Sequence, residues 1–288
     1  MESDIHHSMR VCSAIPDLRS ARRVLPGSLG LTPTMGALHD GHLSLVHRAK
    51  AENDHVGVSI FVNPTQFGPT EDLSRYPRPL ERDLQLLREA GVDLVWTPPA
   101  AEVYPPGFQT AVAVEKVSGP LEGAHRPGHF RGVATVVAKL FNVFTPDRAY
   151  FGQKDAQQAA VIKRMVSDLN FPLEIVICPT VREPDGLAMS SRNAYLNAEE
   201  RRAATILYRA LSAAKAAFEN GERDGEALRS LLANTLASEP LARPDYVSVA
   251  DPDSLDELTR VEGRVLFSLA VRIGTTRLID NFVVGGGG

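Results

Sequence analysis

The sequence predicts an α/β protein: a Rossmann-like, doubly wound parallel sheet, followed by a smaller C-terminal α+β domain. Over the first two-thirds of the chain, short apolar runs typical of strands alternate with segments whose apolar residues recur at helical spacing. This alternation predicts helices on both faces of the sheet and a ligand crevice at the carboxyl ends of its strands. Beyond residue 181 the pattern changes, so we predict two domains, residues 1–181 and 182–288.

Local patterns predict each element in turn. Residues 29–32 are small and apolar and predict a buried strand, and helical spacing from Leu38 to Ala49 predicts the helix after it. A second helix opens at Pro79 and closes at Gly91. Further helices are predicted over 133–144, 155–169, 207–218 and up to about 237, and further strands over 92–96, 149–151, 173–178, 246–250 and within 264–284.

Residues 32–42 join a strand end, a glycine turn and two histidines, His39 and His42. Residues three apart share a helix face, and the N–H groups at a helix start favour an anion. Two imidazoles there can donate to phosphoryl oxygens, so the segment predicts a nucleotide-phosphate site. A pair of surface histidines, or half of a metal site, has the same spacing. Zinc is disfavoured, because no cysteine lies near and the protease pattern needs histidines four apart.

A second motif follows about 150 residues later, where a glycine-led loop carries Ser190, Ser191 and Arg192. Two hydroxyls and a guanidinium suit a clamp on triphosphate oxygens. The alternative is a helix N-cap, but Asn197 with Glu200 predicts a capping box for the next helix. The Ser-Ser-Arg sequence is therefore predicted to face a ligand.

A third motif, Gly152 to Asp155, leads from a strand end into a helix. Lys154 there provides a point charge for phosphate, and Asp155 can accept from a ribose hydroxyl or hold the lysine. Surface Lys-Asp pairs are common, so this motif alone is a weak signal. It indicates a ligand site because it has the same strand-turn-helix context as the first motif.

A fourth motif is the β-branched and aromatic run that ends at Asn63 and Pro64. Pro64 biases Asn63 towards an extended backbone and stops the strand. Gln66 then projects from a strand-end loop, where its amide can donate to and accept from a polyhydroxy acid. A solvated loop glutamine is the alternative.

Composition excludes several classes of protein. The net charge is −4 with no long basic run, so a nucleic-acid surface is not predicted. No apolar run approaches the ~20 residues of a membrane span, and residues 1–10 are polar, so we expect a cytoplasmic protein with no membrane partner. Cys12 and Cys178 are far apart and are expected to be reduced.

Together the four motifs resemble the pantothenate synthetase (pantoate:beta-alanine ligase) family of the HIGH-motif nucleotidylyltransferase superfamily. His39-Asp40-Gly41-His42 is similar to the HIGH signature, and Met189-Ser190-Ser191-Arg192 is similar to the KMSKS-type loop. The resemblance also takes in residues 121–123, 126–133 and 269–281, and spans roughly residues 10–282.

The resemblance implies roles for residues at matching positions. Its implied catalytic residues are His42, the usual proton-donor candidate, with His39, Lys154, Ser190, Ser191 and Arg192. Its implied ATP site comprises Met35, Gly36, Ala37, Leu38, His39, Asp40, Gly41, His42, Gly152, Gln153, Lys154, Asp155, Val181, Met189, Ser190, Ser191 and Arg192. Gln66, Gln158 and Asn63 are implied to bind pantoate and beta-alanine, with Tyr76, Glu122, Arg126 and His129 as second-tier residues. Gln153 departs from the glutamate of many relatives.

The implied activity is ATP-dependent condensation of (R)-pantoate with beta-alanine to pantothenate, AMP and pyrophosphate through a pantoyl adenylate. Domain 1–181 would bind nucleotide and pantoate, and domain 182–288 would close as a lid. The family also implies Mg²⁺ bound with ATP and a homodimer. The metal ligands stay open, with Asp83 a conceivable contributor. Two alternatives remain: a nucleotidyltransferase acting on another acid or phosphate, and a non-catalytic nucleotide sensor.

Overall fold

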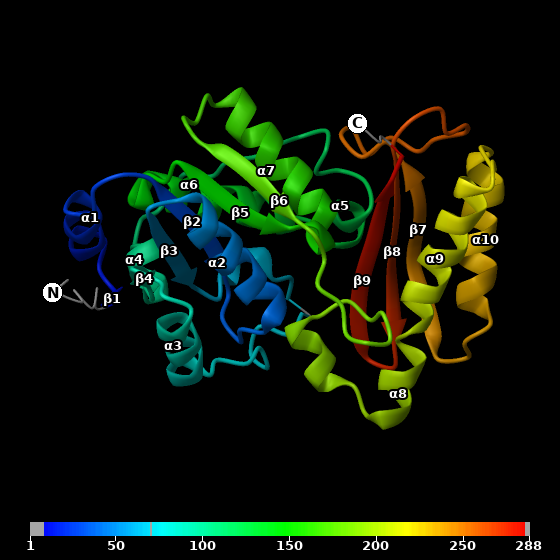
Figure 1. Cartoon of the computed structure of the whole chain (residues 1–288), viewed down its shortest axis with the longest axis horizontal. Coiled ribbons are helices and arrows are strands. Elements are labelled where there is room, and N and C mark those ends of the chain that lie inside the picture. Colours follow the sequence, from blue (N-terminus) through cyan, green and yellow to red (C-terminus); the bar gives the residue numbers. More distant parts are fainter. Residues whose placement is uncertain (1–8, 70, 286–288) are drawn as a thin grey trace, which may run out of the picture. The chain divides into compact units, whose positions relative to one another are not determined.

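The computed structural model describes residues 9–69 and 71–285, which divide into two compact units (Figure 1). The first unit contains the described residues up to Val114 together with Gly128–Gly152 and Ile162–Cys178. The second contains Glu115–Pro127, Gln153–Val161 and the described residues from Pro179 onward. Residues 1–8 of the predicted N-terminal domain, and 286–288 of the predicted C-terminal one, lie outside the described residues.

The first unit is built on a six-stranded sheet in the order β1-β4-β3-β2-β5-β6, and every neighbouring pair is parallel. The predicted doubly wound fold is therefore confirmed. Its strands are β1 (Arg10–Cys12), β2 (Leu29–Thr34), β3 (His55–Ile60), β4 (Leu94–Trp96), β5 (Arg148–Gly152) and β6 (Glu174–Cys178).

Helices cover both faces of this sheet. Alternate strand residues point to opposite faces, so Val56 and Val58 pack with α2 and α3, while the backbone of Gly57 lies against Phe144 of α6. The α-helices of the first unit are α1 (Ile15–Arg23), α2 (Asp40–Glu52), α3 (Leu80–Glu89), α4 (Ala100–Val103) and α6 (His129–Phe144), with the 3₁₀ turn η1 (Pro64–Gln66). Helix α7 (Ala156–Asp168) begins in the second unit and ends in the first.

The second unit contains a three-stranded antiparallel sheet in the order β7-β8-β9. Helices α9 and α10 lie together along one face of it (Figure 1), where Val249, Phe267 and Leu269 join their apolar residues in one core. The sheet comprises β7 (Ala242–Ala250), β8 (Val265–Ile273) and β9 (Thr276–Val284). The helical segments are α5 (Glu122–His125), η2 (Gln153–Asp155), η3 (Ser191–Tyr195), α8 (Ala198–Ala203), α9 (Ile206–Glu219) and α10 (Gly225–Ala237).

The predicted capping box is confirmed at the start of α8. The Asn197 side chain accepts from the backbone N–H groups of Glu199 and Glu200, and the Glu200 carboxylate accepts from Asn197 N. Both partners satisfy N–H groups that a helix start leaves unpaired.

Element ends differ from prediction where the local signal is polar or interrupted. Helix α6 begins at His129, four residues before the predicted start at Val133. The prediction started late because the first turn is mostly polar and does not continue the apolar stripe. Strand β3 ends at Ile60, before the end of the apolar run that the sequence predicted to stop at Asn63 and Pro64. In the part of the chain that the structure describes, no helix combines the length and apolar character that a membrane crossing needs.

Candidate functional site

The turn after β2 holds an unusual backbone. Gly36 has φ +84° and Ala37 has φ +52°, a region that costs a non-glycine residue roughly 1–2 kcal/mol. The Asp83 carboxylate of α3 offsets this strain, since its two oxygens accept from the backbone N–H groups of Ala37 and Leu38, each at 2.8 Å. Asp83 is 1% exposed. A buried carboxylate on a distant helix therefore fixes the turn that leads into α2.

The two histidines lie where this turn meets the helix. His39 is the N-cap of α2, and its Nδ1 accepts from Gly41 N at 3.1 Å. Accepting at Nδ1 leaves the neutral imidazole with its proton on Nε2. His42 lies in the first turn, with ring centroids 4.1 Å from His39. The pair thus lies at the helix end that favours an anion.

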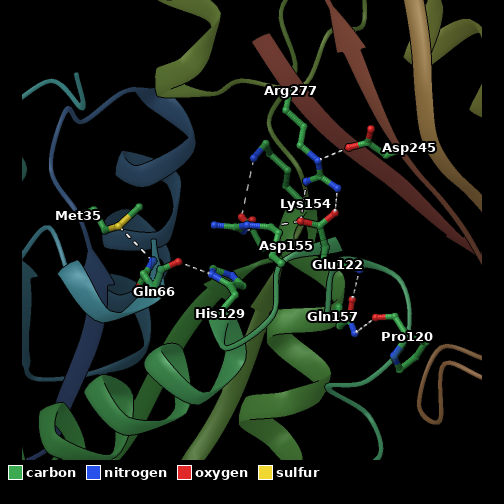
Figure 2. A network of polar contacts seen from close by, with 11 residues as sticks. Met35, Gln66, Pro120, Glu122, His129, Lys154, Asp155, Gln157, Asp245 and Arg277 are labelled. Atoms are coloured by element: carbon green, nitrogen blue, oxygen red, sulfur yellow. Dashed lines mark hydrogen bonds and ion pairs between the residues drawn. The ribbon is translucent and has the colours of Figure 1, made fainter. Parts of the chain in front are cut away.

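The loop after β3 presents Gln66 through a network of partly buried contacts. Asn63 is extended, as predicted, and its Nδ2 donates to the Gln66 Oε1 at 3.0 Å and to the Gly132 carbonyl at 3.2 Å. The Gln66 Nε2 lies 3.2 Å from the Met35 sulfur, and His129 Nδ1 lies 2.8 Å from the Gln66 carbonyl oxygen. Figure 2 shows Met35, Gln66 and His129 joined by the last two contacts.

Gly132 allows this loop to approach α6. A Cβ at this position would lie 2.6 Å from the Thr65 carbonyl carbon and 2.8 Å from the Gln66 nitrogen. Both are backbone atoms, so a larger residue could be accommodated only if the loop or the helix moved. This glycine therefore sets where Gln66 lies against α6.

A cavity of about 450 Å³ opens beside the same turn in the first unit. Met35, Gly36, Phe61 and Pro64 line one part of it, and Asp83 reaches it from α3. Its wall is largely apolar, although Arg78 and Asp83 also line it.

In the second unit, Lys154 lies in the 3₁₀ turn η2 directly after β5 in the chain. Its ammonium lies 3.9 Å from the Asp155 carboxylate, and its side chain is 20% exposed. Asn281 of β9 donates to the backbone carbonyls of Gln153 and Lys154, at 3.0 and 2.8 Å. Gln158 lies half-buried on α7. The third motif thus has the predicted strand-turn-helix context.

Residues 181–189 form a small hairpin that leads into the Ser-Ser-Arg loop. Met189 N donates to the Val181 carbonyl at 3.0 Å, and Arg182 bridges to Ala188. Arg201 donates to Asp185 at 2.7 Å, and these hydrogen bonds lower the pKa of the Asp185 carboxyl. The hairpin is therefore braced by α8.

Ser190 is a helix cap, a role that the sequence analysis assigned to Asn197 alone. Its hydroxyl oxygen accepts from Arg192 N at 3.3 Å and caps η3, so the capping box at α8 did not fill every cap position. The Ser190 O–H group still has a proton to donate. Ser191 and Arg192 lie partly buried in the same turn.

The second-tier residue Glu122 lies in an ion-pair network (Figure 2). Arg277 of β9 donates to both Glu122 oxygens at 2.7 Å and to Asp245 at 2.6 Å. Burial opposes the charge of Arg277, but these carboxylates outweigh it and raise the pKa of the guanidinium. Gln157 also ties the segment down, accepting from Glu122 N at 2.9 Å and donating to the Pro120 carbonyl at 2.8 Å.

Each compact unit gathers its own share of the predicted site residues. The first unit holds the residues of the turn, the histidine pair and the loop after β3: Met35, Gly36, Ala37, Leu38, His39, Asp40, Gly41, His42, Asn63, Gln66 and Gly152. The second holds Gln153, Lys154, Asp155, Gln158, Val181, Met189, Ser190, Ser191 and Arg192. Sequence reasoning missed the supporting roles of Gly132 and Asn281, and treated Asp83 only as a possible metal ligand. A polar residue within the apolar run of β9 was the available signal for Asn281.

The described residues hold no group of three histidine, cysteine or acidic side chains placed to bind a metal. Both oxygens of Asp83 are already engaged by backbone N–H groups.

The first unit is a parallel α/β sheet with a histidine pair after β2, and the second unit holds the lysine turn and the Ser-Ser-Arg loop. These features are typical of a nucleotide-utilising α/β enzyme. The pantoate-beta-alanine ligase family matches residues 9–283. The chain belongs to this family.

Its relatives are similar along their whole length. A pantothenate synthetase of Roseiflexus castenholzii is 66% identical over 276 residues, covering 96% of this chain and 99% of the relative. The crystal structure of pantothenate synthetase from Thermus thermophilus has a TM-score of 0.92 and 50% identity, covering 95% of this chain and 99% of that chain. A pantoate-beta-alanine ligase from Francisella tularensis, complexed with beta-gamma ATP and beta-alanine, has a TM-score of 0.79 and 37% identity, covering 96% and 98%.

Proposed function

We propose that the chain condenses (R)-pantoate with beta-alanine in two steps, through a pantoyl adenylate that stays bound between them. The overall reaction is the ATP-dependent ligation of pantoate with beta-alanine. The observation that carries this assignment is the match of the pantoate-beta-alanine ligase family across residues 9–283, which includes every one of the four motifs.

In the first step a carboxylate oxygen of pantoate attacks the α-phosphorus of ATP, and the bond to pyrophosphate breaks. Negative charge develops on the phosphoryl oxygens, where His39, His42 and Lys154 would donate hydrogen bonds or provide positive charge. Ser190, Ser191 and Arg192 would hold the departing phosphates. No enzyme nucleophile is required, so alignment and charge stabilisation supply the acceleration.

In the second step the beta-alanine amine attacks the activated acyl carbon, AMP leaves with the electron pair of the broken C–O bond, and the nitrogen loses a proton. Gln66 would bind pantoate and lie near the incoming amine, with Asn63 orienting its amide. Gln158 would hold pantoate from α7. Exclusion of water protects the adenylate, which hydrolysis would otherwise destroy.

Mg²⁺ is proposed to enter with ATP. It would neutralise phosphate charge, and the chain would complement it with Lys154 and Arg192 rather than with a carboxylate cage. Chelation should therefore abolish exchange, and added Mg²⁺ should restore it without altering the thermal melting of the free protein. A fall in melting temperature on chelation would instead indicate a structural metal.

We further propose a homodimer in the cytoplasm, and a chain organised as a nucleotide- and pantoate-binding domain of residues 1–181 and a lid of residues 182–288. The Ser190–Arg192 loop would lie at the hinge. Sedimentation equilibrium of the purified chain tests the dimer, and a monomer at micromolar concentration would refute it.

The function is tested by pantoate-dependent exchange of pyrophosphate into ATP with beta-alanine left out. Exchange that requires pantoate, followed by AMP release when beta-alanine is added, is the expected result. ATP binding without exchange would contradict the proposal and favour the nucleotide sensor. Exchange with another acid alone would favour a different transferase. Neither alternative is favoured, because relatives named pantothenate synthetase are 55–66% identical.

Gly132→Ala should raise the KM for pantoate and lower kcat/KM for it by about 10²-fold, because misplacing a substrate group by an ångström costs about that much. The new methyl group would displace the Thr65–Gln66 backbone. Alanine favours a helix over glycine by about 1 kcal/mol, so a weaker α6 would not explain the loss. Steady-state kinetics with pantoate as the varied substrate measure the effect.

The control is Gly263→Ala, where an added Cβ meets no atom within 4 Å. We expect its kinetics to match the parent chain. Unchanged pantoate kinetics in folded Gly132→Ala would show that the approach of α6 does not position Gln66.

A further inference from the structure

The antiparallel sheet of the second unit has two different faces. Val249, Phe267 and Leu278 lie on the face that packs against α9 and α10. On the opposite face, register aligns Ser248 with Ser268, and Ser268 with Asn281. All three of the latter are buried, at 0%, 5% and 3% exposure. A buried row of polar residues lowers the stability of the fold unless its side chains have hydrogen-bond partners.

Asn281 is the member of this row with a full set of partners. Its Nδ2 donates to the backbone carbonyls of Gln153 and Lys154, and its Oδ1 accepts from Gln153 Nε2 at 3.0 Å. The Asn281 amide thus makes three hydrogen bonds, two as donor and one as acceptor, to the short turn η2. By contrast, the hydroxyls of Ser248 and Ser268 have no hydrogen-bond partner in the described part of the chain.

The neighbouring residue Asp280 points to the other face and holds the hairpin that precedes the second motif. Its carboxylate accepts from both terminal nitrogens of Arg182, at 2.6 and 2.9 Å, and Arg182 also donates to the Gly186 carbonyl at 3.0 Å. The Arg182 guanidinium lies over the rings of Tyr208 and Phe282, at 5.1 and 4.8 Å. Successive residues of β9 therefore hold the lysine turn and the hairpin before the Ser-Ser-Arg loop.

We propose that Asn281 is a positioning residue that fixes the backbone of Lys154 so that its ammonium meets the phosphates of ATP, an inference that rests on the proposed function. A 3₁₀ segment of three residues has little stability of its own, and the strand supplies the rigid support that it lacks. With Asp280 on the other face, β9 sets the distance between the lysine and the Ser-Ser-Arg loop within this unit.

The test is a double-mutant cycle between Asn281→Ala and Lys154→Ala, read by pantoate-dependent exchange. Asn281→Ala alone should lower kcat by about 10-fold to 10²-fold, as expected for a group misplaced by about an ångström. In the Lys154→Ala background it should lower kcat little further, because the two residues act through one interaction. Equal factors in both backgrounds would overturn the proposal.

Ser268→Ala is the matched control, since it removes a buried polar group from the same row without touching η2. Its exchange rate should match that of the parent chain. If Asn281→Ala does not melt cooperatively, Asn281→Asp takes its place in the cycle; it keeps the shape but offers no N–H to the two carbonyls. Absence of exchange in the parent chain would refute the proposed function, whereas normal exchange in both the parent and the Asn281 variants would refute this inference alone.

Discussion

His42→Ala should lower the rate of pantoate-dependent exchange by about 10²-fold to 10³-fold, the usual cost of removing one donor to a developing oxyanion. The physical reason is position. His42 lies in the first turn of α2, beside His39 and after a turn that Asp83 holds in place. The backbone support is independent of the imidazole, so the variant should keep the parent melting temperature while losing rate.

His47→Ala is the matched control, because His47 is exposed on the same helix. It should leave exchange unchanged. The loss in His42→Ala should appear mainly in kcat, since a donor that acts on developing charge contributes less to ground-state binding. Near-normal kcat in a folded His42→Ala protein would remove His42 from the proposed mechanism.

Lys154→Ala should cause a loss of similar size, about 10²-fold to 10³-fold in exchange. The ammonium is partly buried and is paired with Asp155 at 3.9 Å, a separation that leaves its hydrogen-bonding capacity for a closer anion. Its backbone is fixed by Asn281, so alanine removes the charge without removing the turn. Salt should weaken ATP binding less in the variant than in the parent.

Lys163→Ala provides the comparison, because Lys163 is an exposed lysine on the helix that follows. Its kinetics and salt dependence should equal those of the parent. If Lys154→Ala and Lys163→Ala behave alike, the lysine turn has no part in catalysis, and phosphate charge must be met by the Ser-Ser-Arg loop.

The elements that sequence predicted best are those with a local cause. The stripe of α3, the run of β6 and the capping box at Asn197 depend on residues a few positions apart, and each lies where expected. Strand β1 and helix α1 were missed, because a three-residue strand and a short polar helix give little periodic signal.

The supporting contacts of the site could not be predicted in the same way. The motifs could be found by residue type and spacing, but the tie from Asp83 to Ala37 and the approach of Gly132 to Thr65 join segments 46 and 67 positions apart. Such pairs follow from how β2, α3 and α6 pack, which no local pattern contains. The segment 264–284 was predicted to contain strands, but the hydrogen bonds from Asn281 to Gln153 and Lys154 depend on how β9 packs and could not be predicted.

The carboxylate of Asp83 has a consequence for how far the histidine motif can be moved. A peptide of residues 29–52 contains the strand, the turn and both histidines but lacks the acceptor for the backbone N–H groups of Ala37 and Leu38. Cut from the protein, it should lose the left-handed turn. The motif therefore cannot be transferred by itself. Grafting it onto another scaffold also requires a buried carboxylate, supplied by a different helix, that accepts from the two backbone N–H groups of the turn.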